Sequence, residues 1–157
     1  MLHDLVLDTN VLVHASNPDC QFHAACGDLL TRLLEVATSL CVDDGFSLIE
    51  ADNRSLIGHE YLQHLRFGMV GFAVVSHLAG TGRVRMVSKA VNASLSKRLN
   101  ILIPVKRDRT FVKVAANSEE RVLGSHDFAD FSVGVRKELL GSAKVRILAA
   151  AEVAAEL

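Results

Sequence analysis

The stretch LVLDTN at residues 5–10 decides the fold class of this chain of 157 residues. Three bulky apolar residues in a row are typical of a strand that is buried on both faces of a parallel sheet. Asp8 ends this run, and we expect its carboxylate to emerge at the carboxyl end of the strand. Thr9 and Asn10 then predict a polar turn. The segment therefore predicts a buried strand that places an acid at one edge of a sheet.

Similar apolar runs recur along the chain and predict further strands at residues 40–42, 84–87, 121–125 and 145–148. Between them, apolar residues at helical spacing predict helices at residues 24–37, 53–65, 68–79, 90–99, 108–116 and 130–140, and an Ala- and Glu-rich helical tail ends the chain. Pro104 favours an edge or a loop at residues 101–105. Such alternation implies right-handed crossovers. We therefore predict one α/β domain over residues 1–157, a three-layer sandwich with a central, mainly parallel sheet flanked by helices.

Composition places the chain among globular proteins, because 50% of its residues are apolar, 22% are charged, and Gly and Pro are few. Disordered, collagen-like and low-complexity classes are excluded. Residues 69–75, the most apolar stretch, are far fewer than the roughly 20 that span a membrane, and we predict a buried core helix there. Residues 1–4 include an acid where a signal peptide has a basic flank. We therefore expect a cytoplasmic protein without a membrane partner.

The three cysteines, Cys20, Cys26 and Cys41, form no C-x-x-C pair, and their odd number indicates reduced thiols. We interpret them as small buried apolar residues. A zinc site of Cys20, His23 and Cys26 is disfavoured, because a fourth ligand is missing and helical spacing places the two cysteines on different faces. His126 has no recognisable nucleophile partner in the sequence, so we expect a structural histidine.

A formal net charge of −1 conceals an uneven distribution. Residues 83–113 contain nine of the 17 basic residues and a single acid, Asp108, whereas the rest of the chain has eight basic and 17 acidic residues. A basic segment beside carboxylates suits a polyanion such as nucleic acid, whose phosphates need cationic contacts. Phe111 is the only aromatic ring in this segment, so a platform for base stacking is not supported. A solvated basic face remains the alternative.

Four acids are candidates for a shared site. Asp8 and Asp127 fall at the carboxyl ends of predicted strands, where open parallel sheets bind ligands. Asp108 opens a predicted helix that leads toward the same edge, and Glu60 lies inside the helix at residues 53–65. Carboxylates brought together repel one another and take up protons unless a cation compensates them. Because all ligands would be oxygens, Mg²⁺ or Mn²⁺ is favoured over zinc.

The acids belong to motifs that follow one another in order: LVLDTN at residues 5–10, Glu60-Tyr61, Asp108 with Phe111, Val112 and Ala115, and SHD at residues 125–127 with Asp130-Phe131. Each motif alone is common, and the specificity comes from the ordered combination. In this combination the sequence resembles the PIN-domain nucleases over most of its length. The resemblance implies an α/β fold with a central parallel sheet and metal-dependent cleavage of RNA at an acidic pocket.

By position, the resemblance implies a catalytic and metal-binding quartet of Asp8, Glu60, Asp108 and Asp127, with Asp130 as a fifth candidate ligand and Asn10 and Ser125 as polar supports. Glu50 is the alternative to Glu60, because the gap that follows Asp8 is longer than in the compact toxin members of the family. A toxin-like member would also have a cognate inhibitory protein, and members of the family often form homodimers.

Together these features favour a single-strand-selective endoribonuclease that uses Mg²⁺ or Mn²⁺. Lys106, Arg107 and Arg109 adjoin Asp108 and are expected to bind the phosphates that flank the scissile bond. A phosphatase of the haloacid-dehalogenase type, with Asp8 as nucleophile, is the competing enzyme; it normally needs a second acid two residues on, where this chain has Asn10. A degenerate domain that binds protein or RNA without catalysis is the non-enzymatic alternative.

Overall fold

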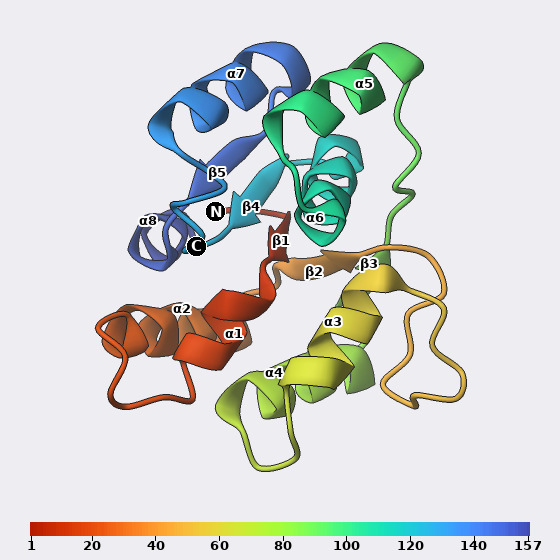
Figure 1. Cartoon of the computed structure of the whole chain (residues 1–157). Coiled ribbons are helices and arrows are strands. Elements are labelled where there is room, and N and C mark those ends of the chain that lie inside the picture. Colours follow the sequence, from red (N-terminus) through yellow and green to blue (C-terminus); the bar gives the residue numbers. More distant parts are fainter.

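The computed structural model describes all 157 residues and consists of a five-stranded parallel sheet with helices packed on both faces (Figure 1). The strands are β1 (Asp4–Leu7), β2 (Ser39–Val42), β3 (Val84–Met86), β4 (Val122–Gly124) and β5 (Arg146–Leu148). They lie in the order β3-β2-β1-β4-β5, and every neighbouring pair is parallel. The predicted fold class, a three-layer α/β sandwich, is confirmed.

Eight helices form the two outer layers: α1 (Thr9–His14), α2 (His23–Glu35), α3 (Leu56–His64), α4 (Val70–Gly80), α5 (Ala93–Leu102), α6 (Lys106–Asn117), α7 (Val133–Ala143) and α8 (Ala150–Glu156). Helices α1, α2, α4 and α8 pack against one another on one side of the sheet, and α5, α6 and α7 lie on the other (Figure 1). Helix α3 contacts both α1 and α6. A single cluster of 37 buried apolar residues joins these layers to the sheet.

β1 occupies the centre of the sheet and is buried over its whole length. It pairs with β4 through Val6 beside Leu123 and Leu7 beside Gly124. A Cβ atom on Gly124 would lie 2.8 Å from Leu7 Cδ2, so a larger residue here would have to displace the end of the Leu7 side chain. The pairing continues past the strands, because the Asp8 amide donates to the Gly124 carbonyl at 2.9 Å. The ends of β1 and β4 are thereby held side by side.

The polar turn predicted at Thr9 and Asn10 is wrong, because helix α1 begins at Thr9 directly after β1. Asp8 has extended backbone angles and is the N-cap residue. Val11 and Leu12 are fully buried, so the apolar face of α1 joins the core as soon as the strand ends. A strand followed at once by a six-residue helix leaves no loop between Asp8 and α1.

Other helix boundaries shift for local reasons. Helix α3 starts at Leu56 instead of residue 53, because the Ser55 hydroxyl accepts from the Gly58 amide as an N-cap. Helix α6 starts at Lys106, which places Asp108 in its first turn instead of at its beginning. Ser132 caps α7 in the same way as Ser55 caps α3, so the predicted start at residue 130 is wrong and Asp130 stays outside the helix.

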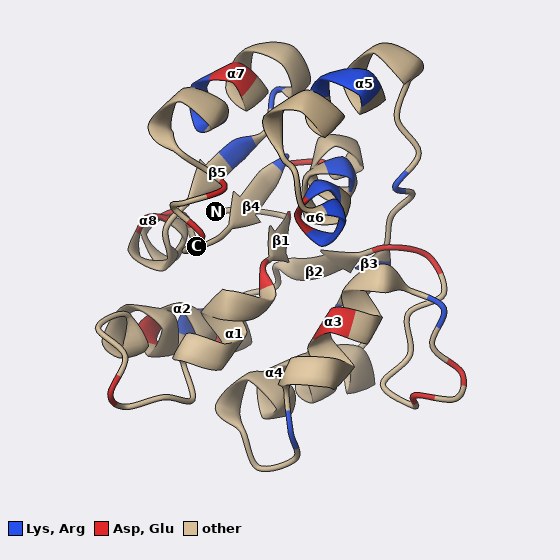
Figure 2. Ribbon diagram, viewed as in Figure 1, with Lys and Arg blue, Asp and Glu red and all other residues tan.

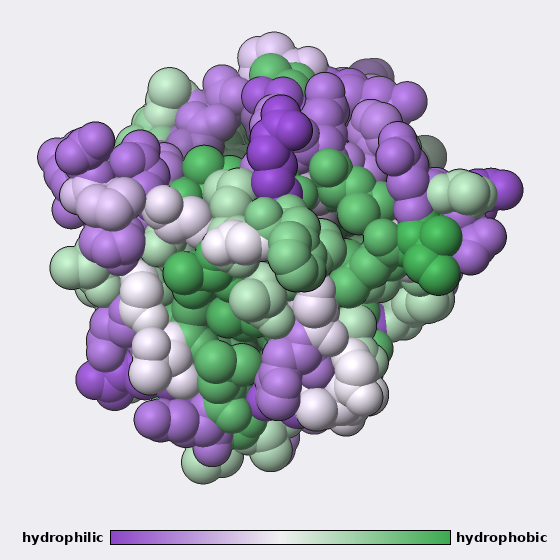
Figure 3. All heavy atoms as spheres, turned by 90° about the horizontal axis from the view of Figure 1, so that it is seen from below, coloured by the Kyte–Doolittle hydropathy of each residue, from purple (hydrophilic) through white to green (hydrophobic).

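Helix α4 covers the apolar stretch at residues 69–75 but is buried on one side only, which corrects the prediction of a buried core helix. Val74 and Val75 belong to the core, whereas Val70 is 48% exposed and the preceding Phe67 is 95% exposed. Seen from below, hydrophobic side chains gather on this face of the molecule (Figure 3). No helix of the structure combines the length and the apolar character that crossing a membrane requires.

Asp43 is fully buried directly after β2. Its carboxylate accepts from the Leu56 amide at 2.8 Å, the Ile57 amide at 2.9 Å and Lys89 Nζ at 3.0 Å, and also from the Ser55 hydroxyl. Burial alone would raise the pKa of Asp43, but these hydrogen bonds lower it overall. Asp43 therefore joins the end of β2 to the start of α3.

Replacing Asp43 by Ala should destabilise the fold by about 2–4 kcal/mol, because buried amide and hydroxyl donors lose a charged acceptor. Urea unfolding at pH 7 measures this difference. Since the pKa of Asp43 is lowered in the folded state, the stabilisation is present above about pH 4 and disappears as the pH falls through the folded-state pKa. The exposed neighbour provides the control: Asp44→Ala should change stability by less than about 0.5 kcal/mol. Equal effects of the two changes would contradict this role of Asp43.

Candidate active site

A cavity of about 290 Å³ opens where α1, α3 and α6 meet the carboxyl edge of the sheet. Its walls contain all four acids of the predicted quartet, Asp8, Glu60, Asp108 and Asp127. In the ribbon, acidic positions lie at the end of β1, on α3 and at the start of α6, where basic positions of α6 adjoin them (Figure 2). The structure therefore brings together acids that are separated by more than 100 residues in the sequence.

Asp8 is held by the two polar residues predicted to support it. Its Oδ2 atom accepts from Ser125 Oγ at 2.7 Å and from Asn10 Nδ2 at 3.0 Å. Ser125 Oγ in turn accepts from the Asp127 amide at 3.1 Å, and Asn10 Oδ1 accepts from the His126 amide at 3.1 Å. Burial raises the pKa of Asp8 and Asp127 adds to this effect, while the hydrogen bonds from Ser125 and Asn10 oppose it.

Asp108 is the least satisfied acid of the cavity. The residue is 3% exposed, and as a carboxylate it leaves its Oδ2 atom buried without a hydrogen-bond partner, because a bond with Asp130 needs a proton on one of the two carboxyls. Burial, a hydrogen bond with Asp130 and the nearby charges of Asp8 and Asp127 together raise the pKa of Asp108 to about 7. The N-terminus of α6 favours a carboxylate in its first turn, but this attraction does not offset the loss of water.

Asp127 and Asp130 complete the acidic wall. Carboxylate oxygens of Asp108, Asp127 and Asp130 lie within 4.8 Å of one another. The Asp130 amide donates to Asp127 Oδ1 at 3.0 Å, which fixes the turn between the two acids. Both residues are half-buried, and Asp127 lines the cavity. Asp130 is thus grouped with the acids of the quartet, as its position in the motif suggested.

Of the two alternatives for the remaining acid, the structure brings Glu60 to the cavity and leaves Glu50 on an exposed turn. The Glu60 side chain is 15% exposed, with Oε2 3.6 Å from His64 Nε2 and 4.0 Å from Arg107 Nη1. The neighbouring Tyr61 is buried, and its hydroxyl donates to the Leu7 carbonyl at 2.6 Å. This bond fixes α3 against the end of β1, so Glu60 lines the same cavity as Asp8.

The three basic residues beside Asp108 have different environments. Arg107 lines the cavity, with Nε 3.7 Å from Asp108 Oδ1, and its side chain is 57% exposed. Lys106 is exposed and lines an adjacent cavity of about 230 Å³ that shares Glu60 and Arg107 with the first. Arg109 Nη1 donates to the carbonyls of residues 103 and 104, each at 2.8 Å, and so stabilises the connection between α5 and α6.

The donor set fits a divalent cation. Two buried oxygens that line the cavity, Asp108 Oδ2 and Thr9 Oγ1, have no hydrogen-bond partner. Unpaired buried oxygens and clustered carboxylates cost free energy that a cation would recover. Because the ligands are all oxygens, Mg²⁺ or Mn²⁺ suits them better than zinc. Asp8, Glu60, Asp108, Asp127 and Asp130 are the residues that could hold it.

The sequence interpretation did not identify His14 as a residue of this cavity. His14 lies one helical turn after Asn10 on α1, so both side chains face the segment at residues 125–127. The spacing of four residues was the available signal, but it has meaning only once the turn predicted at Thr9 is recognised as a helix. Burial lowers the pKa of His14.

Comparison of the sequence with protein-family models gives no match, and curated proteins and solved structures give none either. The class of protein is therefore defined by fold and site alone: a parallel α/β protein with an acid-lined cavity at the carboxyl edge of its sheet. The resemblance to the PIN-domain nucleases stays a prediction.

The raised pKa of Asp108 makes the metal-free fold sensitive to pH. An unfolded aspartate has a pKa of about 3.9. Because the folded-state pKa of Asp108 is about 7, stability is highest at low pH and is lost as the pH rises from about 4 through 7. Asp108→Asn removes this ionisation, so with a chelator present its melting temperature should exceed that of the wild type more at pH 8 than at pH 5. Glu50→Gln, at an exposed acid, should follow the wild type at both pH values. If the melting temperatures of Asp108→Asn and the wild type differed by the same amount at pH 5 and pH 8, Asp108 would not be the source of the pH dependence.

Proposed function

We propose that this chain is a metal-dependent nuclease that hydrolyses phosphodiester bonds of single-stranded RNA. The observation that supports this proposal most strongly is the buried, unpartnered Asp108 Oδ2 atom among the carboxylates of Asp127 and Asp130. A protein that used these acids only for packing would pair or solvate that oxygen, as it does for Asp43.

In this proposal the four acids of the cavity, with the adjoining Asp130, hold one or two Mg²⁺ or Mn²⁺ ions. Such an ion, when bound, lowers the pKa of a coordinated water and stabilises negative charge on a phosphate. Ser125 and Asn10 fix the orientation of the Asp8 carboxyl, because both donate to its Oδ2 atom. Arg107, which is half-exposed beside Glu60 and Asp108, is placed to bind a phosphate oxygen at the mouth of the cavity.

The charge distribution favours a nucleic acid over a small phosphate ester. Lys106, Arg107 and Arg109 lie in the first turn of α6, and Lys106 lines the second cavity next to the acids. A chain of phosphates could contact these cations outside the acidic cavity, whereas a monoester would reach only the cavity itself. The lack of an aromatic platform in the basic segment suits backbone contacts more than base recognition.

A phosphatase that uses Asp8 as nucleophile is less well supported. Asp8 Oδ2 already accepts two hydrogen bonds, and the residue two positions on, Asn10, donates to Asp8 instead of acting as an acid. A binding module without catalysis is the other alternative. It gives no reason for a carboxylate oxygen that is buried without a partner.

Asp8→Asn should lower Mn²⁺-dependent cleavage of an unstructured RNA by about 100-fold or more, because a ligand charge is lost while Ser125 and Asn10 remain in place. Cleavage is followed on gels, Mn²⁺ uptake by calorimetry, and folding by circular dichroism. Glu50→Gln is the matched control and should cleave like the wild type, because Glu50 is exposed outside the cavity. Full activity of Asp8→Asn would refute the site. Hydrolysis of a phosphate monoester without cleavage of RNA would favour the phosphatase, and absence of Mn²⁺ uptake by the wild type would favour the binding module.

Lys106→Ala should weaken RNA binding and reduce the slope of log affinity against log salt by about 1, because one phosphate contact is lost. Binding is measured by fluorescence anisotropy in an Asp8→Asn background, which prevents turnover. Lys137→Ala on α7 is the control, since Lys137 is also exposed but lies on a helix that does not line the cavity. Identical salt slopes for the two lysine variants would place the RNA elsewhere.

A further inference from the structure

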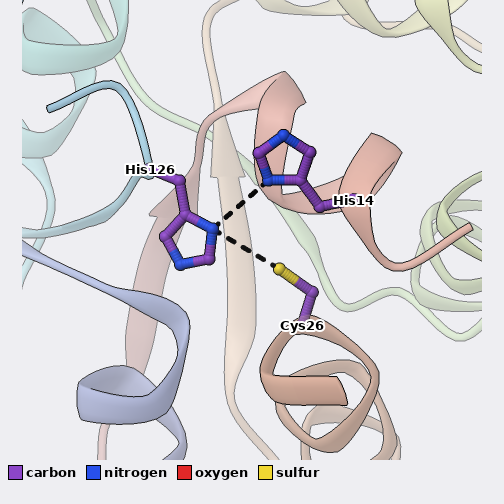
Figure 4. A group of neighbouring side chains, drawn as sticks. All are labelled: His14, Cys26 and His126. Carbon is purple, nitrogen blue, oxygen red and sulfur yellow. Dashed lines mark hydrogen bonds between the residues drawn. The ribbon is translucent and has the colours of Figure 1, made fainter. Parts of the chain in front are cut away.

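A second cluster of polar side chains lies beside the acid cavity and consists of His14, Cys26 and His126 (Figure 4). The three residues come from α1, from α2 and from the segment that follows β4. His126 Nδ1 lies 3.3 Å from His14 Nδ1 and 3.7 Å from Cys26 Sγ. Two histidines and a thiol at such distances could bind a transition metal, or they could form a hydrogen-bonded relay.

The far side of the His126 ring distinguishes these two possibilities. His126 Nε2 accepts from the Ala150 amide at 3.0 Å, in the first turn of α8. Because a backbone amide can only donate, Nε2 has no proton, and the proton of the neutral ring lies on Nδ1. A metal bound at Nδ1 would require the proton on Nε2, directly against the Ala150 N–H. The contact with Ala150 therefore favours the relay over the metal.

The hydrogen bond from His126 also determines the tautomer of His14. His126 Nδ1–H points between His14 Nδ1 and Cys26 Sγ (Figure 4). Because His14 Nδ1 accepts the hydrogen bond from this N–H, the proton of the neutral His14 ring must lie on Nε2. Nε2 is on the side of the ring turned away from both His126 and Cys26 (Figure 4). His14 itself lines the acid cavity together with Asp8 and Asp127.

Aromatic contacts restrict the rotation of both imidazole rings. Phe22 stacks on His14 with ring centres 5.6 Å apart, and it packs on His126 at 4.3 Å. Phe128 also stacks on His126, with ring centres 5.7 Å apart. The Ala150 amide at His126 Nε2 and the His126 ring at His14 Nδ1 each require an unprotonated nitrogen, so both rings are neutral. Burial raises the pKa of Cys26 to about 12, so this thiol stays protonated.

We propose that His126 is a positioning residue that holds His14 with its Nε2–H directed to the acid cavity, where this N–H donates to a phosphate oxygen of the substrate. The inference rests on the proposed nuclease function for its ligand. A neutral donor suits this place, because it binds an anionic oxygen without forming an ion pair with the neighbouring carboxylates. His14 then acts on the substrate directly, and His126 acts through His14.

The tautomers can be measured independently of any activity. Long-range ¹H–¹⁵N correlation spectra of the full chain, with no metal added, should show His126 protonated at Nδ1 and His14 protonated at Nε2. In His126→Leu the His14 ring should become a mixture of tautomers, whereas His126→Asn, whose amide can donate from the position of Nδ1, should retain the Nε2–H form. A proton on His126 Nε2 in the wild type would overturn the inference. Added Co²⁺ that produces a thiolate charge-transfer band lost in Cys26→Ser would also overturn it, in favour of a metal site.

The role toward phosphate is tested by RNA cleavage at saturating Mn²⁺. His14→Leu should lower the cleavage rate by about 10- to 100-fold, the loss expected for one hydrogen bond to a charged group. His14→Gln, which retains a donor near the position of Nε2, should recover most of that loss, and Mn²⁺ uptake at the acids should be the same in both variants. His77→Gln, at an exposed histidine of α4, is the control. Cleavage by His14→Leu at the wild-type rate overturns the role of His14 alone, whereas a wild type that binds no Mn²⁺ and cleaves no RNA overturns the proposed function and the phosphate role with it.

Discussion

The pairing of β1 with β4 is the constraint on which the site depends. These strands are far apart in the sequence, yet the Asp8 amide donates to the Gly124 carbonyl and the Ser125 hydroxyl reaches Asp8 Oδ2 at 2.7 Å. The register sets Leu7 beside Gly124, where the end of the Leu7 side chain packs over the glycine. A shift of one residue would turn Asp8 away from Ser125. Backbone pairing in the core therefore fixes the geometry of the acids, and the contacts between their side chains follow from it.

The buried acids of this chain differ in whether their carboxylate oxygens have hydrogen-bond partners. Asp4 and Asp43 are fully buried, and both are paired: Asp4 accepts from the amides of Glu119 and Glu120 and from Arg85, and Asp43 accepts from the start of α3. Asp108 is almost as deeply buried but keeps an oxygen without a partner. Since the fold satisfies its structural acids, the unsatisfied one points to a ligand as the missing partner.

The sequence predicted those parts of the molecule that depend on local pattern. Apolar runs located all five strands, and strand ends located Asp8 and Asp127, because burial on both faces and emergence at an edge are properties of short segments. The role of Asp43 depends on amides that arrive 13 and 14 residues later, which no local pattern specifies. His14 was missed because Thr9 and Asn10 resemble a turn in isolation, whereas the buried Val11 and Leu12 make a helix there. Tertiary burial outweighed local propensity at that point.

Helix α1 connects the acids of the cavity with the cluster of His14, Cys26 and His126. Its six residues are enough to reach both. Asp8 caps the helix, Asn10 accepts from the His126 amide, and His14 meets the His126 ring one turn later. One face of α1 is therefore tied at two points to residues 125–127, whose Ser125 and Asp127 belong to the acid wall. A movement of His126 would be transmitted to Asn10 through the backbone and to His14 through the ring. The acids and the histidines are thus positioned by the same few bonds, so the orientation of His14 and the orientation of Asp8 depend on one common segment.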